Sequence, residues 1–294
     1  MEYPPLRHLN LASGPLAYRQ SGRGDPLILI HGWRGSSSHW QETMAALADI
    51  RSVHAFDLPG HGGTPPRQRP LTTEGLASLA IDFADKTGLD RFDLVGHSFG
   101  SAVAVAIAAH WPDRVRRLVL TSLGTARTDL ERQALNQAYA WMNLVLFWWR
   151  PWLDWSRPWA GFQQPWLDWL GGQPAVSRSI AAPFVQQWPT DDDLVNEGVR
   201  EFLNTDPLSA LEVAISAGSP GFQSAIKKVT APVLLLSGDR DLLTPHSAVA
   251  ALAEHLADCR LVMLENCGHM PMIEWPRLFL RKLREFLITG EVAG

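Results

Sequence analysis

Cysteines and clusters of basic residues are scarce in this sequence. Of 294 residues only Cys259 and Cys267 are cysteines, which are too few for a disulfide framework. The formal net charge is −4, and no run of Lys and Arg is long enough to neutralise a series of phosphates. We therefore expect no nucleic-acid partner, and the lack of a disulfide framework favours a reduced, cytoplasmic setting.

Long hydrophobic runs are also missing. The longest ones, Ala102 to Ala109 and Leu144 to Trp149, are far shorter than the roughly 20 residues that span a bilayer. The first ten residues contain no apolar stretch like that of a secretory signal. We therefore expect no transmembrane segment. We expect the aromatic run at 144–149 to pack over a pocket, and weak contact with a lipid interface is the alternative.

What is present is the composition of a folded protein, with 46% hydrophobic and 19% charged residues. Short apolar runs of strand length recur before turn signals, at 27–30, 53–56, 92–95, 118–120, 233–236 and 261–264. Such runs suit strands buried on both faces, and intervening stretches such as 40–48 and 74–86 are typical of helices. The sequence predicts an α/β fold with an open, mostly parallel, twisted sheet flanked by helices. Residues 6–9 and 16–19 are expected to form a leading hairpin.

Residues 125–205 have a different pattern. They contain no strand-like run, and nine of the chain's thirteen Trp residues lie between Trp141 and Trp188. We expect a helix over 129–149, and we expect six prolines to break the remainder into short pieces. These are Pro151, Pro158, Pro165, Pro174, Pro183 and Pro189. We therefore predict a core made of 1–124 and 206–294, with a helical, Trp-rich cap inserted at 125–205.

The segment Gly96-His97-Ser98-Phe99-Gly100 matches the pattern G-x-S-x-G. It follows the strand-like run 92–95 and precedes an Ala-rich helical stretch, which is the context in which this pattern forms a nucleophile elbow. Small residues are needed beside the serine because the turn is sharp. The pattern predicts Ser98 as a nucleophile.

A serine hydroxyl needs a base that takes its proton and a carboxylate that orients the base. Asp241 follows the run 233–236, and His269 follows the run 261–264. Both therefore lie where an open α/β sheet places its sites, at the carboxyl ends of strands. We predict His269 as the general base and Asp241 as the orienting acid.

Acyl transfer also requires donors for the developing oxyanion, and backbone N–H groups can provide them. The expected donors are the amide of Phe99, directly after the nucleophile, and the amide of Trp33 in the glycine-containing loop after the run 27–30.

Together these motifs resemble the α/β-hydrolase superfamily, in its serine-nucleophile, carboxylesterase-like branch with a helical cap. The segments that carry the resemblance are His31-Gly32-Trp33-Arg34-Gly35, Asp57-Leu58-Pro59-Gly60-His61-Gly62, Gly96-His97-Ser98-Phe99-Gly100-Ser101, Gly238-Asp239-Arg240-Asp241 and Gly268-His269-Met270-Pro271. The resemblance implies an α/β-hydrolase fold, with the variable cap at 125–205. It assigns the acid to Asp241, and Asp239 is the main rival.

Departures from related groups narrow the expected chemistry. Haloalkane dehalogenases and epoxide hydrolases carry Asp where this chain has Ser98. Hydrolases of carbon–carbon bonds usually resemble Gly-Asn-Ser-Met-Gly-Gly, with Trp after the catalytic His. Here His97, Phe99, Ser101 and Met270 stand at those places. A carbon–carbon hydrolase is therefore the second choice.

We expect an enzyme that hydrolyses carboxylic esters of apolar acyl or aromatic groups through an acyl-enzyme on Ser98. The partner is a small ester or related carbonyl compound, and neither a cofactor nor a metal is expected. The alternatives are a carbon–carbon hydrolase of the meta-cleavage type, a cofactor-free perhydrolase with the same triad, and a non-catalytic binding protein on this fold. Substrate contacts are expected from Trp33, Phe99, Trp141, Trp149, Trp155, Trp169 and Met270. The sequence carries no signal for an oligomeric state.

Overall fold

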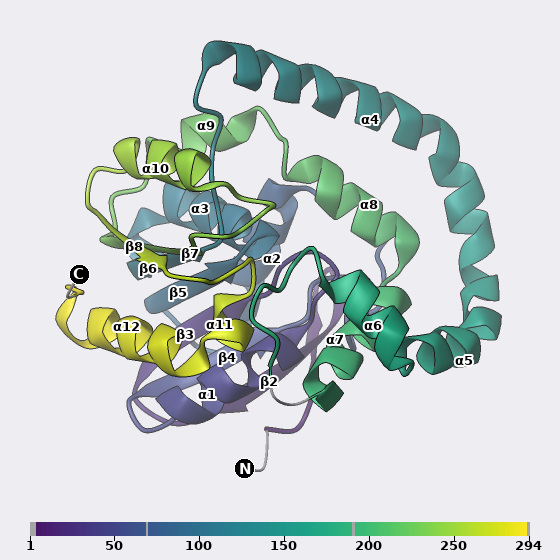
Figure 1. Cartoon of the computed structure of the whole chain (residues 1–294), viewed down its shortest axis with the longest axis horizontal. Coiled ribbons are helices and arrows are strands. Elements are labelled where there is room, and N and C mark those ends of the chain that lie inside the picture. Colours follow the sequence, from purple (N-terminus) through teal and green to yellow (C-terminus); the bar gives the residue numbers. More distant parts are fainter. Residues whose placement is uncertain (1–3, 69, 190–191, 293–294) are drawn as a thin grey trace.

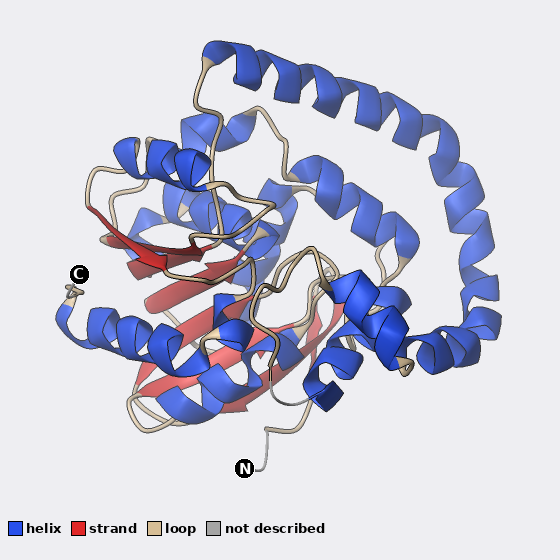
Figure 2. Ribbon diagram, viewed as in Figure 1, coloured by secondary structure: helices blue, strands red, loops and turns tan. Residues whose placement is uncertain are grey.

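The computed structural model, which describes residues 4–68, 70–189 and 192–292, is built around one eight-stranded sheet (Figures 1 and 2). The strand order is β1-β2-β4-β3-β5-β6-β7-β8. The strands are β1 (Arg7–Leu11), β2 (Gly14–Ser21), β3 (Asp25–Ile30), β4 (Arg51–Phe56), β5 (Phe92–His97), β6 (Val115–Thr121), β7 (Val233–Gly238) and β8 (Cys259–Leu264). The β1–β2 hairpin is antiparallel and also pairs antiparallel with β4, whereas all other pairs are parallel. The predicted α/β class and mostly parallel sheet are confirmed.

Helices cover both faces of the sheet (Figure 2). One face carries α2 (Thr73–Lys86), α3 (Phe99–His110), α9 (Gly221–Ile226) and α10 (His246–Glu254), and the other carries α1 (Gln41–Leu47) and α12 (Pro276–Thr289). Alternate strand residues point to opposite faces, so Ile28 and Ile30 join one buried cluster, whereas Leu27 and Leu29 join the other. This double burial explains why the strands are apolar throughout.

The connection from β6 to β7 is helical. It contains α4 (Asp129–Ser156), a 3₁₀ turn (Arg157–Trp159), α5 (Ala160–Gly171), α6 (Pro174–Ala181), α7 (Asp192–Asn204), α8 (Pro207–Ser216) and α9. The Thr128 hydroxyl caps α4 by accepting a hydrogen bond from the Glu131 amide at 3.1 Å. The division into a core and a cap at 125–205 stays a prediction.

The expectation that Pro151 and Pro165 break the helices is wrong. Pro151 lies inside α4 and Pro165 lies inside α5. A proline within a helix removes one hydrogen bond and crowds the carbonyl four residues earlier, and a bend relieves that conflict without ending the helix. Figure 1 shows α4 curving along the outer edge of the molecule. No helix within the described residues is long and apolar enough to cross a membrane.

Candidate active site

Ser98 occupies a strained turn between β5, which ends at His97, and α3, which begins at Phe99. Its φ is 52° and its ψ is −119°, a conformation that is unfavourable for a residue with a side chain. A Cβ on Gly96 would lie 2.5 Å from the α3 backbone, and a Cβ on Gly100 would lie 2.3 Å from a backbone oxygen of β3. Only glycine fits at both positions, so the turn forms as the motif predicts.

The structure brings Ser98, His269 and Asp241 together in one hydrogen-bonded row. His269 Nε2 lies 2.9 Å from Ser98 Oγ, and His269 Nδ1 lies 2.8 Å from Asp241 Oδ2. The other oxygen of Asp241 accepts hydrogen bonds from the amides of Leu243 and Thr244, both at 2.9 Å. Because Asp241 accepts at Nδ1, the ring carries its proton there and presents a free lone pair on Nε2 to the serine.

Asp239, the rival for the acid, does not contact His269. Its side chain lies in an exposed part of the same loop and accepts a hydrogen bond from the Cys267 amide at 3.3 Å. Geometry therefore favours Asp241 over Asp239 as the partner of His269.

The backbone of His269 is fixed from three sides. Its carbonyl accepts hydrogen bonds from His97 Nε2 at 2.8 Å and from Ser122 Oγ at 2.9 Å. Its amide donates to the carbonyl of Phe184, between α6 and α7, at 2.9 Å. Burial holds the pKa of His97 well below its ordinary value, so this ring is neutral and donates from Nε2. These bonds fix the backbone from which the imidazole of His269 projects, and the bond to Asp241 orients the ring itself.

A single buried carboxylate, Glu274 of α11 (Pro271–Glu274), joins two segments beside His269. It accepts hydrogen bonds from the amides of Gly268 and Met270, at 2.9–3.1 Å, and from those of Gln186 and Gln187, at 2.8 and 2.9 Å. Charge-assisted bonds of this kind are stronger than neutral ones. Glu274 therefore ties the His269 loop to the connection between β6 and β7.

The two predicted oxyanion donors lie in segments next to Ser98. Phe99 is the first residue of α3, so its amide has no acceptor within the helix, and the helix dipole favours negative charge there. A Cβ on Gly32 would lie 3.1 Å from Ser98 Cβ, which shows how closely the loop after β3 approaches the serine. Trp33 follows directly, and its indole Nε1 donates to the Ala210 carbonyl at 2.7 Å. The roles of both amides stay predictions.

The loop after β3 is also held by α7. Arg34 donates to the Phe202 carbonyl at 2.7 Å, and its guanidinium lies 4.8 Å from the Phe202 ring centre. The carboxyl of Glu201 accepts hydrogen bonds from Ser36 Oγ at 2.8 Å and from Ser38 Oγ at 2.7 Å. Burial raises the pKa of Glu201 to about 7. These contacts fix the loop that carries the Trp33 amide.

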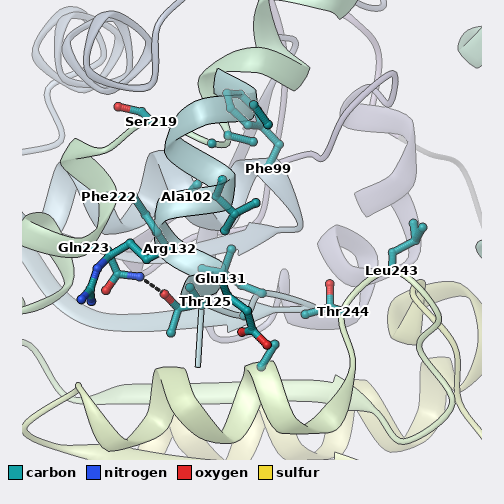
Figure 3. A pocket seen from close by; sticks show the side chains of 18 of the residues that line it. Phe99, Ala102, Thr125, Glu131, Arg132, Ser219, Phe222, Gln223, Leu243 and Thr244 are labelled. Atoms are coloured by element: carbon teal, nitrogen blue, oxygen red, sulfur yellow. Dashed lines mark hydrogen bonds between the residues drawn. The ribbon is translucent and has the colours of Figure 1, made fainter. Parts of the chain in front are cut away.

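Ser98 lines a largely apolar cavity of about 680 Å³, and Figure 3 shows other residues of its wall, among them Phe99, Ala102 and Phe222. Phe99 and Ala102 of α3 form one wall, and the first turns of α4, the segment 217–223 and the loops after β6 and β7 form the others. Its longer polar side chains are those of Glu131, Arg132, Asn136 and Gln223. Sequence reasoning missed the apolar wall residues Leu123, Leu135, Phe222 and Leu243. Leu123 and Leu243 could have been found because they follow strand ends, but Leu135 and Phe222 carry no such signal.

Among the predicted substrate contacts, only Phe99 lines this cavity. Trp33 and Met270 line a second cavity of about 210 Å³, between the loop after β3 and helices α6 and α7. Trp141, Trp149, Trp155 and Trp169 line neither cavity and are 54–68% exposed. The helices that carry these four tryptophans turn their indoles toward solvent, which does not favour the expected contact with the substrate, and that contact stays a prediction.

Comparison with known proteins finds a matching family and similar relatives. Residues 27–281 match the model of the alpha/beta hydrolase family. A pimeloyl-[acyl-carrier protein] methyl ester esterase of Nitrosomonas europaea is 26% identical, over 88% of this chain and 94% of the relative. A pyrrolizixenacetamide deacetylase of Xenorhabdus hominickii is also 26% identical, over 98% of this chain and all of the relative.

Solved structures share the fold. A putative lipase from Acinetobacter baumannii has a TM-score of 0.76 at 21% identity, covering 97% of this chain and 91% of that one. An enol-lactonase from Burkholderia xenovorans has a TM-score of 0.72 at 21% identity, covering 96% of this chain and 99% of that one.

Proposed function

Because the chain belongs to the alpha/beta hydrolase family and is a hydrolase, we propose that it is a serine esterase acting on carboxylic esters of apolar acyl or aromatic groups. The observation that carries the proposal is the hydrogen-bonded row from Asp241 through His269 to Ser98, which ends at an apolar cavity. The row supplies a nucleophile, a base and an orienting charge.

In the first half of the reaction, Ser98 Oγ attacks the ester carbonyl carbon while His269 Nε2 takes the hydroxyl proton. The carbonyl oxygen becomes an oxyanion, which the amides of Phe99 and Trp33 stabilise. The carbon–oxygen bond to the alcohol then breaks, and the leaving alcohol takes the proton from His269. Asp241 stabilises the imidazolium between these two transfers.

In the second half, a water molecule attacks the acyl-enzyme and gives its proton to His269. The second tetrahedral intermediate collapses, the carboxylic acid leaves, and Ser98 Oγ recovers its proton. Every proton is carried by His269, so no cofactor enters the scheme.

The cavity supports an apolar acyl group because its walls near Ser98 are Phe99, Ala102, Leu123 and Leu243. Burial of apolar surface contributes about 25 cal/mol per Å², so binding is expected to strengthen as the acyl chain lengthens within the cavity. The two relatives above act on an ester and on an acetamide, which makes amides the natural comparison substrates.

The proposal is tested with p-nitrophenyl esters of increasing acyl length, measured beside the matching anilides and a ring-fission diketone. We expect kcat/KM to be highest for esters and to rise with acyl length before it falls at the cavity's limit. Ser98→Ala should lower ester turnover by up to about 10⁶-fold and abolish labelling by a fluorophosphonate probe.

Exposed Ser224, outside the row, provides a matched control, and Ser224→Ala should retain both turnover and labelling. Labelling at a serine other than Ser98 would overturn the assignment of the nucleophile. Turnover of the diketone alone would replace the esterase by the carbon–carbon hydrolase.

A further inference from the structure

The solvent-exposed side of helix α4 is more apolar than is usual for a helix that faces water. Its inward stripe consists of Tyr139, Leu146 and Leu153, which pack on Leu208, Leu211 and Ile215 of α8. Among the described side chains of α4 only Leu146 is buried. A helix packed along so narrow a stripe normally carries polar residues on its other sides.

The side of α4 opposite this stripe is aromatic. At 100° per residue, Trp141, Trp148 and Trp155 lie seven residues apart on one line, about half a turn away from Leu146. They are 66–72% exposed. The surface continues along the next elements through Trp159, Phe162, Trp166 and Trp169, all exposed. We call the exposed aromatic residues of 141–169 the aromatic ridge.

The charged residues near the ridge all have polar partners. Residues 133–177 contain four of them, Arg150, Asp154, Arg157 and Asp168. Arg150 pairs with Glu212 of α8, and Arg157 pairs with Asp206 at 2.9 Å and with Asp154 at 2.5 Å. Asp168 accepts a hydrogen bond from Asn204 at 2.6 Å. The ridge therefore exposes a series of large aromatic side chains among which none of these four charges lacks a partner, and an exposed apolar surface of this kind marks an interaction site.

From these observations we propose that the aromatic ridge inserts into the interface of an uncharged or zwitterionic lipid bilayer. Tryptophan suits this layer because its ring is apolar while its N–H can remain hydrated. The ridge is also convex: Figure 1 shows α4 arching along the rim of the molecule, with α5 continuing the rim. A fluid lipid surface conforms to a convex ridge, whereas an identical convex ridge on a second copy would match it poorly.

The pairing of these four charges specifies the lipid. Basic residues that would attract anionic headgroups are absent from the described part of the ridge, and the chain as a whole carries a net charge of −4. Binding is therefore expected to be as strong on phosphatidylcholine vesicles as on vesicles containing phosphatidylglycerol. It should also change little between about 0.05 and 0.5 M NaCl, because only electrostatic binding is screened.

The experiment is co-flotation of the full chain with phosphatidylcholine vesicles. Trp148→Gln combined with Trp155→Gln should weaken binding at least tenfold, because each indole loses apolar burial in the interface. Glutamine keeps helix propensity, and both indoles are exposed, so the variant should melt at the wild-type temperature. Ile288→Gln is the matched control, since Ile288 is an exposed apolar residue of α12, remote from the ridge, and it should bind like the wild type.

Three results would overturn the proposal. The first is wild-type protein that does not float with phosphatidylcholine vesicles. The second is a wild-type protein that is a dimer by light scattering and a double variant that is a monomer, with neither protein floating with vesicles. That result would mean that the ridge binds a second copy of the chain. The third is binding that requires phosphatidylglycerol and disappears in high salt.

Discussion

At the scale of single residues, the site depends on conformations that few other residues could adopt. Ser98 keeps a positive φ because Gly96 and Gly100 leave room for the backbone around it. This part was predictable from the sequence, since the G-x-S-x-G pattern specifies both glycines. The anchoring of the His269 loop by Phe184 and Glu274 was not predictable, because these residues lie in no recognisable pattern, and Phe184 acts through its backbone carbonyl while the Glu274 carboxylate binds backbone amides.

The choice between the two aspartates is testable at this scale. Asp241→Asn should lower kcat by up to about 10⁴-fold, the loss seen when the orienting carboxylate of a serine protease triad becomes an amide. Asp239→Asn should cost less than about tenfold, because Asp239 contacts the Cys267 amide and not His269. Steady-state kinetics on one ester compares them, and a larger loss for Asp239→Asn would make our assignment of the acid wrong.

At the scale of elements, the predicted strands and flanking helices are confirmed to within a few residues, since buried strands and amphipathic helices leave periodic patterns. The helices after β6 were harder to predict for two reasons. Proline was expected to end helices, yet α4 and α5 continue through Pro151 and Pro165. The tryptophans of these helices were expected to line a pocket. Amino-acid composition, however, does not specify which side of a helix packs against the rest of the protein.

The first turns of α4 are expected to set the acyl-length preference. Ala138 lines the cavity, whereas Ala140, two residues further on, does not. Ala138→Trp should fill part of the cavity and lower kcat/KM for long-chain esters by about tenfold or more, while acetate esters are nearly unaffected. The matched change Ala140→Trp should leave the profile unaltered. An equal loss for acetate and long-chain esters in the Ala138 variant would show that the acyl group lies elsewhere.

At the scale of the whole molecule, buried neutral histidines link stability to pH. Burial lowers the pKa values of His39, His54 and His61 to about 4, and it lowers those of His31 and His97 further. The unfolded chain binds these protons near pH 6.5, so it holds more protons than the folded chain between about pH 4 and 6.5. The contribution of these neutral histidines to the free energy of unfolding is fully present above pH 6.5 and is lost as the pH falls toward 4.

We expect the free energy of unfolding, measured with denaturant, to fall steeply from pH 6.5 to 4, by at most about 3 kcal/mol for each of the three histidines near 4. Glu201 acts oppositely: its folded pKa of about 7 exceeds the unfolded value, so its contribution is lost as the pH rises from 4.5 to 7. Glu201→Gln should therefore gain stability relative to the wild type as the pH rises from 5 to 8. A flat profile between pH 4 and 6.5 would contradict the neutral state of the histidines.

The ribosome makes Ser98 long before it makes Asp241 and His269, which the proposed mechanism requires. At roughly 5–20 residues per second, about ten to thirty seconds separate the synthesis of Ser98 from that of His269. His269 then needs the carboxylate of Glu274, which joins its loop to Gln186 and Gln187. On the proposed mechanism, a nascent chain therefore carries Ser98 without its base, and turnover requires that His269 has been made and that Glu274 holds its loop. A chain stalled before Glu274 should accordingly not react with a fluorophosphonate probe.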